Sequence, residues 1–487
     1  MGYARNRTLS AFGWKFLERL IFQGTNFIVT LVLARLLSPG DYGLVALVLV
    51  FVAFANTFVQ GGFNTALIQK KDANGGDFFS VLIFSLVVAA ALYAALFFGA
   101  PLLADYYGMS QIIPIIRILS LVVFPAAVNS IQVAWISKAF RFRVLTVSSL
   151  ISMLLAAMVS IFLAIKGFGA WALVVQQLIS HTGACVINYL LTGWLPRGKF
   201  SMNRIRHLVP FGSRVLASNL LVTFFMELRS LIIGRMYTPV DLGYFKRGKQ
   251  FPQTVMDSVS GTIQSVLLPV YAREQDNQQR ILDMVRHAIR LSSFLIFPLM
   301  VGLACVAEPL IRLLLTDKWL PSVPFLQVFA FAYLCQPAQI ATAQAYKALG
   351  DSTTPLKLEF FRKTVEIGLL LMSLRYGVFA IAASSVAAGV ISLAAAIWPN
   401  IKKLRYSLKA QLSDLAPAFL LSLGMAAVLI LLGRMIQNAA VALALQTFIG
   451  GSFYLVFARI FRMKALSAIN SILANILKSL GERKSRR

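Results

Sequence analysis

The chain contains few of the residues from which active sites and soluble surfaces are built. Charged residues make up 13% of its 487 positions, about half of the roughly 25% that is usual in soluble proteins. No G-x-x-x-x-G-K-[ST] sequence occurs, and GDSTTPLK at 350–357 does not fit that pattern. The histidines and cysteines are scattered, without the spacing of a zinc site or of a disulfide framework: His181, His207, His287, Cys185, Cys305 and Cys335. We therefore expect no catalytic residue, no metal site, no cofactor and no direct ATP hydrolysis.

Apolar residues dominate instead, at 58% of the chain. They form long continuous runs rather than the short alternating segments of a membrane β-barrel. Inside hydrocarbon every backbone N–H and C=O needs an internal partner, which a helix supplies. A spanning helix needs about 20 mostly apolar residues. On that measure we predict an all-α polytopic membrane protein of about fourteen spans. Their expected limits are 11–34, 42–64, 78–103, 112–136, 144–165, 170–193, 208–234, 242–270, 287–313, 323–348, 357–375, 378–399, 412–433 and 439–460.

The formal net charge of +28 does not indicate a nucleic-acid partner, because the basic residues recur between apolar runs instead of forming one patch. Alternate loops are basic, as the positive-inside rule expects of cytoplasmic loops. Members of this basic set include Arg5, Arg7, Lys70, Lys71, Lys138, Arg141, Arg197, Arg204, Arg280, Arg286, Lys347, Lys402, Lys403 and the tail ending at Arg487. Both termini are therefore expected in the cytoplasm, and the N-terminal segment reads as a retained first helix.

The chain also repeats itself. VLARLLSPGDYG at 32–43 matches IIGRMYTPVDLG at 232–243, with an offset of 200 residues between Arg35 and Arg235. Lys138 matches Lys347 at an offset of 209, and GAWAL at 169–173 matches GVFAI at 377–381 at an offset of 208. These matches predict two parallel repeats of six spans, and transporters built from repeats place the substrate between them. The expected parts are a first lobe at 1–200, a second lobe at 201–405, two further spanning helices at 406–465 and a basic cytoplasmic tail at 466–487.

Charged residues inside spans are the candidate functional residues, since a charge at the centre of a bilayer costs about 2.5–3.5 kcal/mol or more. The expected substrate-binding residues are Arg19, Arg214, Arg229, Lys246, Arg247 and Lys249, and Glu18 and Glu227 are candidates for ion coupling. Three cations at 246–249 suit an anionic substrate such as a phosphate. The alternative is an anchor for anionic lipid headgroups.

Other polar positions favour structural roles. Lys15 lies near the cytoplasmic edge, where a lysine can snorkel, and Arg117 fits a helix end. Asp41 and Asp241 are placed to cap the helices that follow them. Pro252 and Pro269 are expected to bend the eighth span or to end it early.

Three segments resemble a known family. VLARLLSPGDYGLVALVLVFVAFANTFVQGGFNTALIQKKD at 32–72, LGYFKRGKQFPQTV at 242–255 and TDKWLPSVPFLQVF at 316–329 are similar to polysaccharide exporters of the multidrug/oligosaccharidyl-lipid/polysaccharide (MOP) flippase superfamily. The colanic-acid-exporter-like lipopolysaccharide biosynthesis proteins are the type they resemble. The resemblance implies a V-shaped bundle of two six-helix lobes in the bacterial inner membrane. It also implies a substrate of undecaprenyl pyrophosphate carrying an oligosaccharide repeat unit, moved from the cytoplasmic to the periplasmic leaflet.

The partners expected on this reading are the lipid-linked oligosaccharide and inner-membrane lipids, with a polysaccharide polymerase and a chain-length regulator as candidates. Two other functions are weighed against it. An efflux transporter of small organic molecules, in the same superfamily, would need acidic residues in its cavity, whereas the intramembrane charges here are mostly basic. A membrane enzyme would need a large loop or a cluster of catalytic residues, and neither is present in the sequence.

Overall fold

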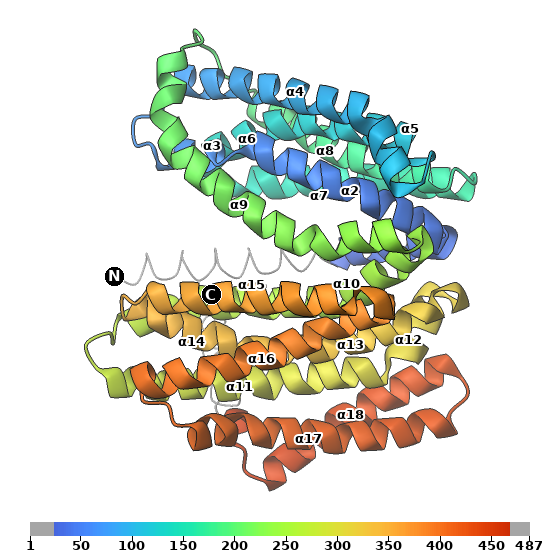
Figure 1. Ribbon diagram of the computed structural model, residues 1–487, viewed down its shortest axis with the longest axis vertical. Helices are drawn as coiled ribbons and strands as arrows, with labels where there is room; N and C mark the ends of the chain where they lie inside the picture. The colour runs from blue at the N-terminus through green and yellow to red at the C-terminus, as the bar shows by residue number, and fades with distance from the viewer. Residues whose placement is uncertain (1–23, 468–487) are drawn as a thin grey trace, which may run out of the picture. The chain divides into compact units, whose positions relative to one another are not determined.

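The computed structural model describes residues 24–467 (Figure 1), and every regular element within that range is a helix. The all-α prediction is therefore confirmed. The chain divides into two compact units, of which unit 1 ends at Gly243 and unit 2 begins at Tyr244. The lobes predicted from the repeat, with a boundary at 200/201, are a different division and stay a prediction. The predicted first span starts outside the described residues, and its described part is the apolar helix Gly24–Leu36.

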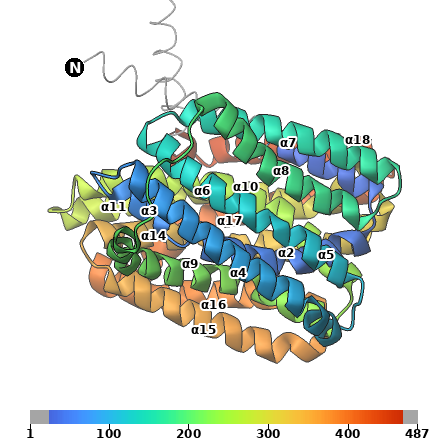
Figure 2. The same cartoon turned by 90° about the horizontal axis from the view of Figure 1, so that it is seen from above.

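Unit 1 packs its helices around small apolar side chains. After Gly24–Leu36 come α2 (Pro39–Gln60), α3 (Phe63–Gln69), α4 (Gly75–Tyr107), α5 (Ile112–Leu119), the 3-10 turn η1 (Ser120–Val122), α6 (Val123–Lys138), α7 (Phe142–Ile165), α8 (Ala170–Thr192) and α9 (Met202–Met236). The helices α7 and α8 run side by side (Figure 2), and α9 lies against α2, α3 and α4. Ala55, Ala89 and Ala127 are buried between α2, α4 and α6, so these helices approach closely, as membrane helices do through small residues.

Unit 2, over its described residues, is also all-helical and ends in a helix pair, α17 and α18. Its helices are α10 (Pro239–Ala272, whose first residues belong to unit 1), α11 (Gln278–Cys305), α12 (Ala307–Leu315), η2 (Asp317–Ser322), α13 (Val323–Tyr333), α14 (Gln336–Ala348), α15 (Thr353–Ser373), η3 (Leu374–Tyr376), α16 (Val378–Leu404), α17 (Leu408–Met435) and α18 (Ala439–Ile460). Met256, Met300 and Ala330 are buried where α10, α11 and α13 meet. The pair α17–α18 packs against α11 through α17.

Eleven helices of the described chain, some continuing across short breaks, are long and apolar enough to cross a membrane. The predicted count of fourteen is not confirmed, and the difference lies in three segments. The first is described only over Gly24–Leu36, which is short. The other two, α10 and α15, carry several charged side chains each, and these lower their mean hydropathy. The ninth predicted span, 287–313, is also displaced, because α11 begins at Gln278 and ends at Cys305. Arg280 and Arg286 therefore lie on this helix instead of in a loop.

The repeated motif at 38–43 and 238–243 builds two similar helix starts. Ser38 Oγ accepts from the Asp41 backbone N–H at 3.1 Å, and the Ser38 backbone N–H donates to the Asp41 carboxylate at 3.0 Å. Thr238 and Asp241 make the same pair of bonds at 3.2 and 3.1 Å. Both satisfy backbone N–H groups that a helix start otherwise leaves free. The predicted capping roles of Asp41 and Asp241 are confirmed.

Proline does not interrupt α10. The helix runs without a break from Pro239 to Ala272 and contains both Pro252 and Pro269, so the predicted early end of this span is wrong. Each proline removes one intrahelical hydrogen bond. In membrane helices neighbouring helices and hydroxyl side chains compensate for such losses. Thr254 and Ser258 donate their hydroxyls to backbone carbonyls of Gln250 and Thr254, in the turns that follow Pro252.

Candidate functional site

The three cations predicted at 246–249 lie together near the start of α10, and we call them the basic segment: Lys246, Arg247 and Lys249. They do not share one environment. Arg247 has 4% of its surface exposed, whereas Lys246 and Lys249 are half-buried. The neighbouring Gly248 faces the same interior, where an added Cβ would lie 2.5 Å from the Cβ of Phe325. The helix is therefore pressed against η2 and α13 at this point, and its rotation is fixed.

An aromatic wall holds the basic segment in place. The guanidinium carbon of Arg247 lies 5.1 Å from the centre of the Trp319 ring, and its Nη1 donates to Gln250 Oε1 at 2.7 Å. Lys249 Nζ lies 5.9 Å from the centre of the Phe329 ring. Such cation–π contacts contribute about 0.5–2 kcal/mol each, and more as water is excluded. Trp319 is fully buried. The segments 242–255 and 316–329, which carried the family resemblance, thus pack on each other.

The predicted residues of α9 belong to unit 1 and have different surroundings. Glu227 accepts a hydrogen bond from Ser230 Oγ at 2.9 Å. Arg229 is half-buried on the same helix, and Arg214 is exposed about three turns beyond the helix start. Glu18 and Arg19, with Lys15, lie outside the described residues. The structure therefore brings the basic segment together within unit 2 and places Glu227 and Arg229 on a different helix, in unit 1. Binding of substrate by these residues, and ion coupling by Glu18 and Glu227, stay predictions.

Unit 2 also contains a polar cavity of about 360 Å³ that the sequence analysis did not identify, and we call it the α14 cavity. It is enclosed by α10, α14, α15 and α16. Its polar lining residues are Asp257, Ser260, Gln264, Gln336, Gln339, Thr342, Gln344, Lys347, Glu359, Arg362 and Ser392. Four of its charged residues lie within or beside predicted spans. The rule that selected the basic segment would have selected Asp257 and Arg362 as well, so the signal was present in the sequence.

Unit 1 has a smaller polar cavity of about 270 Å³, which we call the α6 cavity. It is bordered by Asn26 and by residues of α6, α7 and α8. Its polar lining residues are Asn26, Asn129, Ser149, Ser152, Gln176, Gln177, Ser180 and His181. Asn129 Oδ1 accepts from Asn188 Nδ2 at 2.9 Å, and Gln132 Nε2 donates to the carbonyl of Cys185 at 3.1 Å. Polar bonds of this kind join α6 to α8 beside the cavity.

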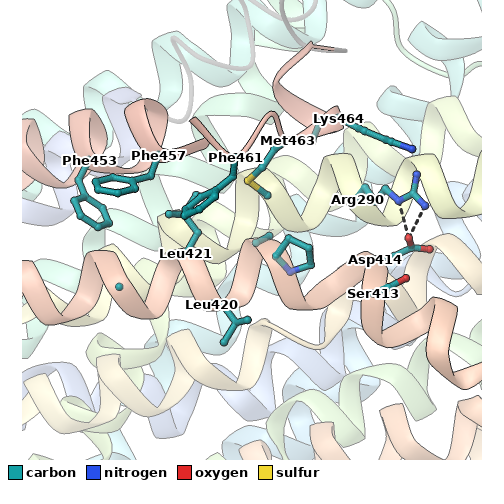
Figure 3. A pocket seen from close by; sticks show the side chains of 14 residues that line it. Arg290, Ser413, Asp414, Leu420, Leu421, Phe453, Phe457, Phe461, Met463 and Lys464 are labelled. Carbon is teal, nitrogen blue, oxygen red and sulfur yellow. Dashed lines mark hydrogen bonds and ion pairs between the residues drawn. The ribbon is translucent and has the colours of Figure 1, made fainter. Parts of the chain in front are cut away.

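A third pocket, of about 760 Å³, lies along α17 and α18 and is mostly apolar (Figure 3). Phe453, Phe457 and Leu421 line its apolar part, and Arg290 and Lys464 lie at the other end. An elongated apolar surface with cations at one end suits a hydrocarbon chain that carries an anionic group.

Beside this pocket a buried carboxylate fixes α17 to α11. Asp414, with 1% of its side chain exposed, pairs with Arg286 at 2.8 Å and with Arg290 at 2.6 Å. The Tyr406 hydroxyl donates to the same carboxylate at 2.8 Å. Two arginines and a phenol satisfy the buried charge, as burial of an ion requires. The additional helix pair is therefore attached to unit 2 through a specific polar connection.

Comparison with known proteins gives a consistent group of relatives. The profile of a family described as polysaccharide biosynthesis protein matches residues 32–324. The chain is 26% identical over 320 residues to the succinoglycan biosynthesis transport protein ExoT of Rhizobium meliloti, which covers 66% of this chain and 65% of that protein. It is 23% identical to the teichuronic acid biosynthesis protein TuaB of Bacillus subtilis, over 57% of this chain and 58% of that protein. With the lipopolysaccharide biosynthesis protein WzxC of Escherichia coli the identity is 21%, over 66% of each.

These alignments span somewhat less than two thirds of each relative's length. Solved structures extend the likeness over more of the chain. The lipid II flippase MurJ in an inward closed conformation matches with a TM-score of 0.72 and 17% identity, over 91% of this chain and 98% of that one. An inward-facing multidrug resistance MATE family transporter of the MOP superfamily matches with a TM-score of 0.59 and 15% identity, over 79% and 94%. At such identities the likeness establishes a shared fold.

Proposed function

Since the chain belongs to the family of polysaccharide biosynthesis proteins, we propose that it is a flippase for lipid-linked oligosaccharides. The substrate is an undecaprenyl pyrophosphate that carries an oligosaccharide repeat unit of a surface polysaccharide. The protein moves this lipid from the cytoplasmic to the periplasmic leaflet of the bacterial inner membrane, with its own N- and C-termini in the cytoplasm. It forms and breaks no covalent bond in this process.

The observation that carries this proposal, beside family membership, is the basic segment of α10. Arg247 is nearly fully buried in a membrane protein, stacked on Trp319. Arginine presents a fork of donors that pairs with phosphate oxygens. Lys246 and Lys249, half-buried on the same helix, add two positive charges. A cluster of three cations fits a pyrophosphate better than the cationic drugs of an efflux transporter.

The rest of the chain supports the transport steps. The apolar pocket along α17 and α18 offers hydrocarbon-like surface, so the polyprenyl chain stays in an apolar environment while the headgroup moves. The two compact units are the bodies that would alternate between inward-open and outward-open states. Glu227, which accepts from Ser230, and Glu18 are the carboxylates proposed for coupling to an ion gradient. Inner-membrane lipids surround the protein, and a polysaccharide polymerase and a chain-length regulator would receive the product.

Deleting the gene tests the proposed function directly. We expect the lipid-linked oligosaccharide to accumulate on the cytoplasmic face of the inner membrane and the surface polysaccharide to be lost. Its accessibility to a membrane-impermeant glycan probe, compared between inside-out and right-side-out vesicles, measures this. An unchanged distribution, together with efflux of cationic drugs by the overproduced protein, would instead favour the small-molecule transporter.

The basic segment is tested by complementing that deletion with Lys246→Ala and, separately, Arg247→Ala. We expect either change to abolish export while the protein stays inserted and abundant. Arg434→Ala is the matched control, because Arg434 is an exposed cation in the last turn of α17. Normal export by both variants of the basic segment would show that the cluster only anchors α10 at the membrane interface.

A further inference from the structure

The two polar cavities occupy corresponding places in the two repeats. With the offset of 209 residues that relates Lys138 to Lys347, Ser149 and Met153 of the α6 cavity correspond to Leu358 and Arg362 of the α14 cavity. With the offset of 208 that relates α8 to α16, Ala184 corresponds to Ser392. Each cavity is lined by the last three helices of its repeat together with one further element, which is α10 in the α14 cavity and the segment of Asn26 in the α6 cavity. The two cavities therefore correspond in part, over the three helices that the repeats share.

The chemistry of the two cavities differs. The lining of the α6 cavity consists of neutral residues and His181, whereas the α14 cavity is lined by Asp257, Glu359, Lys347 and Arg362. Two of these charges form an ion pair, since Arg362 Nη2 lies 2.6 Å from Glu359 Oε1. The sequence predicts that α10 and α15 span the membrane, where charged side chains are costly and usually face a wet, functional cavity. On that prediction, the charged lining of the α14 cavity has a free-energy cost that the lining of the α6 cavity avoids.

Two polar atoms that line the α14 cavity are buried and make no hydrogen bond within residues 24–467: Ser260 Oγ and Arg362 Nε. A buried polar atom without a partner costs about 1–3 kcal/mol, so native proteins rarely leave one in that state. The amide side chains of Gln336 and Gln339, one turn apart on α14, line the same cavity, and Gln339 Nε2 donates to the Gly389 carbonyl at 3.5 Å. The cavity thus presents donors and acceptors that a small ligand can satisfy.

The charge balance disfavours cationic and anionic ligands. Asp257 and Glu359 offset Lys347 and Arg362, so the lining has no net charge. No group of three or more His, Cys, Asp or Glu side chains suited to a metal ion occurs among the described residues, and two cations in the same lining oppose a bound cation. The guanidinium of Arg362 is already paired with Glu359, which disfavours an anion. A neutral ligand rich in hydroxyl groups remains, because amide side chains both donate to and accept from hydroxyls.

We propose that the α14 cavity is a sugar-recognition subsite, which binds a neutral sugar of the lipid-linked glycan and gives the protein its preference for a glycosylated lipid. A volume of about 360 Å³ is at the small end of ligand pockets, which suits part of a glycan and not a whole repeat unit. This inference rests on the proposed flippase function. It assigns the pyrophosphate to the basic segment and the sugar to a separate set of amide groups.

The test uses the purified full chain in proteoliposomes with two probes, undecaprenyl pyrophosphate carrying one glucose and undecaprenyl pyrophosphate without a sugar. A membrane-impermeant pyrophosphatase reports how fast each lipid reaches the outer leaflet. We expect the unaltered protein to move the glucose-bearing lipid faster. Gln336→Leu combined with Gln339→Leu removes two neutral hydrogen-bonding groups, which should lower this preference about tenfold and leave movement of the bare lipid unchanged.

Two further variants distinguish a loss of sugar binding in the cavity from a general loss of folding or transport. Ala343→Leu narrows the cavity without removing a polar group and should lower the preference in the same direction. Gln327→Leu makes the same chemical change in unit 2 outside the cavity, where Gln327 donates to the Ala304 carbonyl, and should leave the preference unchanged.

The other possible outcomes distinguish failure of the proposed flippase function from failure of the sugar subsite. If the unaltered protein moves neither lipid, the proposed function fails. If it moves both equally, or if the cavity variants keep the preference, the sugar subsite fails and the flippase stands. A change in sodium or proton dependence without a change in preference would overturn the subsite in favour of a cation site.

Discussion

Asp351, in the loop between α14 and α15, makes several polar contacts. Its carboxylate accepts from the backbone N–H groups of Thr353 at 3.1 Å and Thr354 at 3.0 Å, and from both threonine hydroxyls. It also pairs with Lys403 Nζ at 2.6 Å. The segment GDSTTP, which superficially resembles a phosphate-binding loop, thus caps the start of α15 and fastens it to the end of α16. The bond from Lys403, followed by the bond from Thr354, lowers the pKa of Asp351 well below its usual range.

We predict that Asp351→Asn lowers the free energy of unfolding at neutral pH by about 1–3 kcal/mol, because charge-assisted hydrogen bonds are lost. A carboxyl group whose pKa is lowered by folding stabilises the folded state fully above its unfolded pKa. That contribution declines as the pH falls through the folded pKa. The difference between the two proteins should therefore narrow below the ordinary value of 3.8. Thermal unfolding at neutral pH and at about pH 3 measures it. Asp276→Asn, in the exposed loop before α11, is the control, and an equally large difference at both pH values would contradict the prediction.

At the residue scale, the sequence identifies the charged residues that lie within predicted spans, but not the burial or the contacts of each side chain. Lys246, Arg247 and Lys249 were selected because cations inside a span are costly, and all three do lie on one helix. The rotation of that helix is set by its contact with Phe325 and Trp319, far away in sequence. Composition therefore could not indicate that Arg247 is buried while its neighbours are half-buried. The α14 cavity was missed because its lining comes from four helices, and only the fold brings these together.

At the scale of elements, the starts of α2 and α10 cross at very short distance within unit 1. A Cβ placed on Gly43 would overlap the carbonyl oxygen of Pro239, and one on Gly243 would overlap the carbonyl oxygen of Pro39. The two repeated motifs thus contact each other reciprocally, glycine against proline. Gly40, one turn before Gly43, has ordinary space, with a Cβ position 3.5 Å from Val240. The repetition of glycine at 43 and 243 is explained by this crossing.

We predict opposite effects for two identical substitutions on α2. Gly43→Ala should lower the free energy of unfolding by about 1–3 kcal/mol, since backbone atoms of the two helices must move apart. Gly40→Ala should be neutral or stabilising by up to about 1 kcal/mol, because alanine is the better helix former. Thermal unfolding of the purified variants gives both values. Equal behaviour of the two variants would mean that the crossing is not maintained in the membrane.

Element boundaries were predicted well where hydrophobic runs are uninterrupted and poorly where helices are polar. The predicted spans 144–165, 170–193 and 439–460 agree closely with α7, α8 and α18. The helix α10 continues through Pro252 and Pro269, although proline removes an intrahelical hydrogen bond and often ends a helix. The start of α11 was predicted nine residues late, since its first turns carry Arg280 and Arg286 and are therefore too polar for a hydropathy argument.

At the scale of the whole molecule, the all-helical class and the presence of internal repetition follow from composition and offsets alone. The division into two compact units cannot be predicted from composition and offsets. The structure assigns α9 to unit 1, because α9 packs on α2, α3 and α4, whereas the repeat places the same helix at the start of the second lobe. Packing and ancestry are different properties, and a sequence repeat reports the second. The number of membrane crossings also depends on α10 and α15, which hydropathy alone does not assign.

We predict that α15, which hydropathy alone does not assign as a span, crosses the membrane. Its 21 residues are long enough for a bilayer core, since a spanning helix needs about 20 residues. Four of its five charges form two pairs, Arg362 with Glu359 at 2.6 Å and Lys363 with Glu366 at 3.2 Å, and the fifth, Lys357, lies in the first turns of the helix. An ion pair is less costly in hydrocarbon than two separate charges. Its pairing partner α16 passes the hydropathy criterion, and the two helices pack along each other.

Cysteine labelling can decide whether α15 spans. In a background without Cys185, Cys305 and Cys335, single cysteines are placed by Ser352→Cys, before α15, and by Gln437→Cys, after α17; both positions are exposed. If α15 crosses, three helices separate the two positions, which then lie on opposite sides of the membrane. We expect an impermeant maleimide to label the first only in inside-out vesicles and the second only in intact cells. If α15 lies on the membrane surface, only α16 and α17 cross between them and both cysteines label from the same side. That outcome would also remove the membrane cost from Glu359 and Arg362, and with it the main reason for treating their cavity as functional.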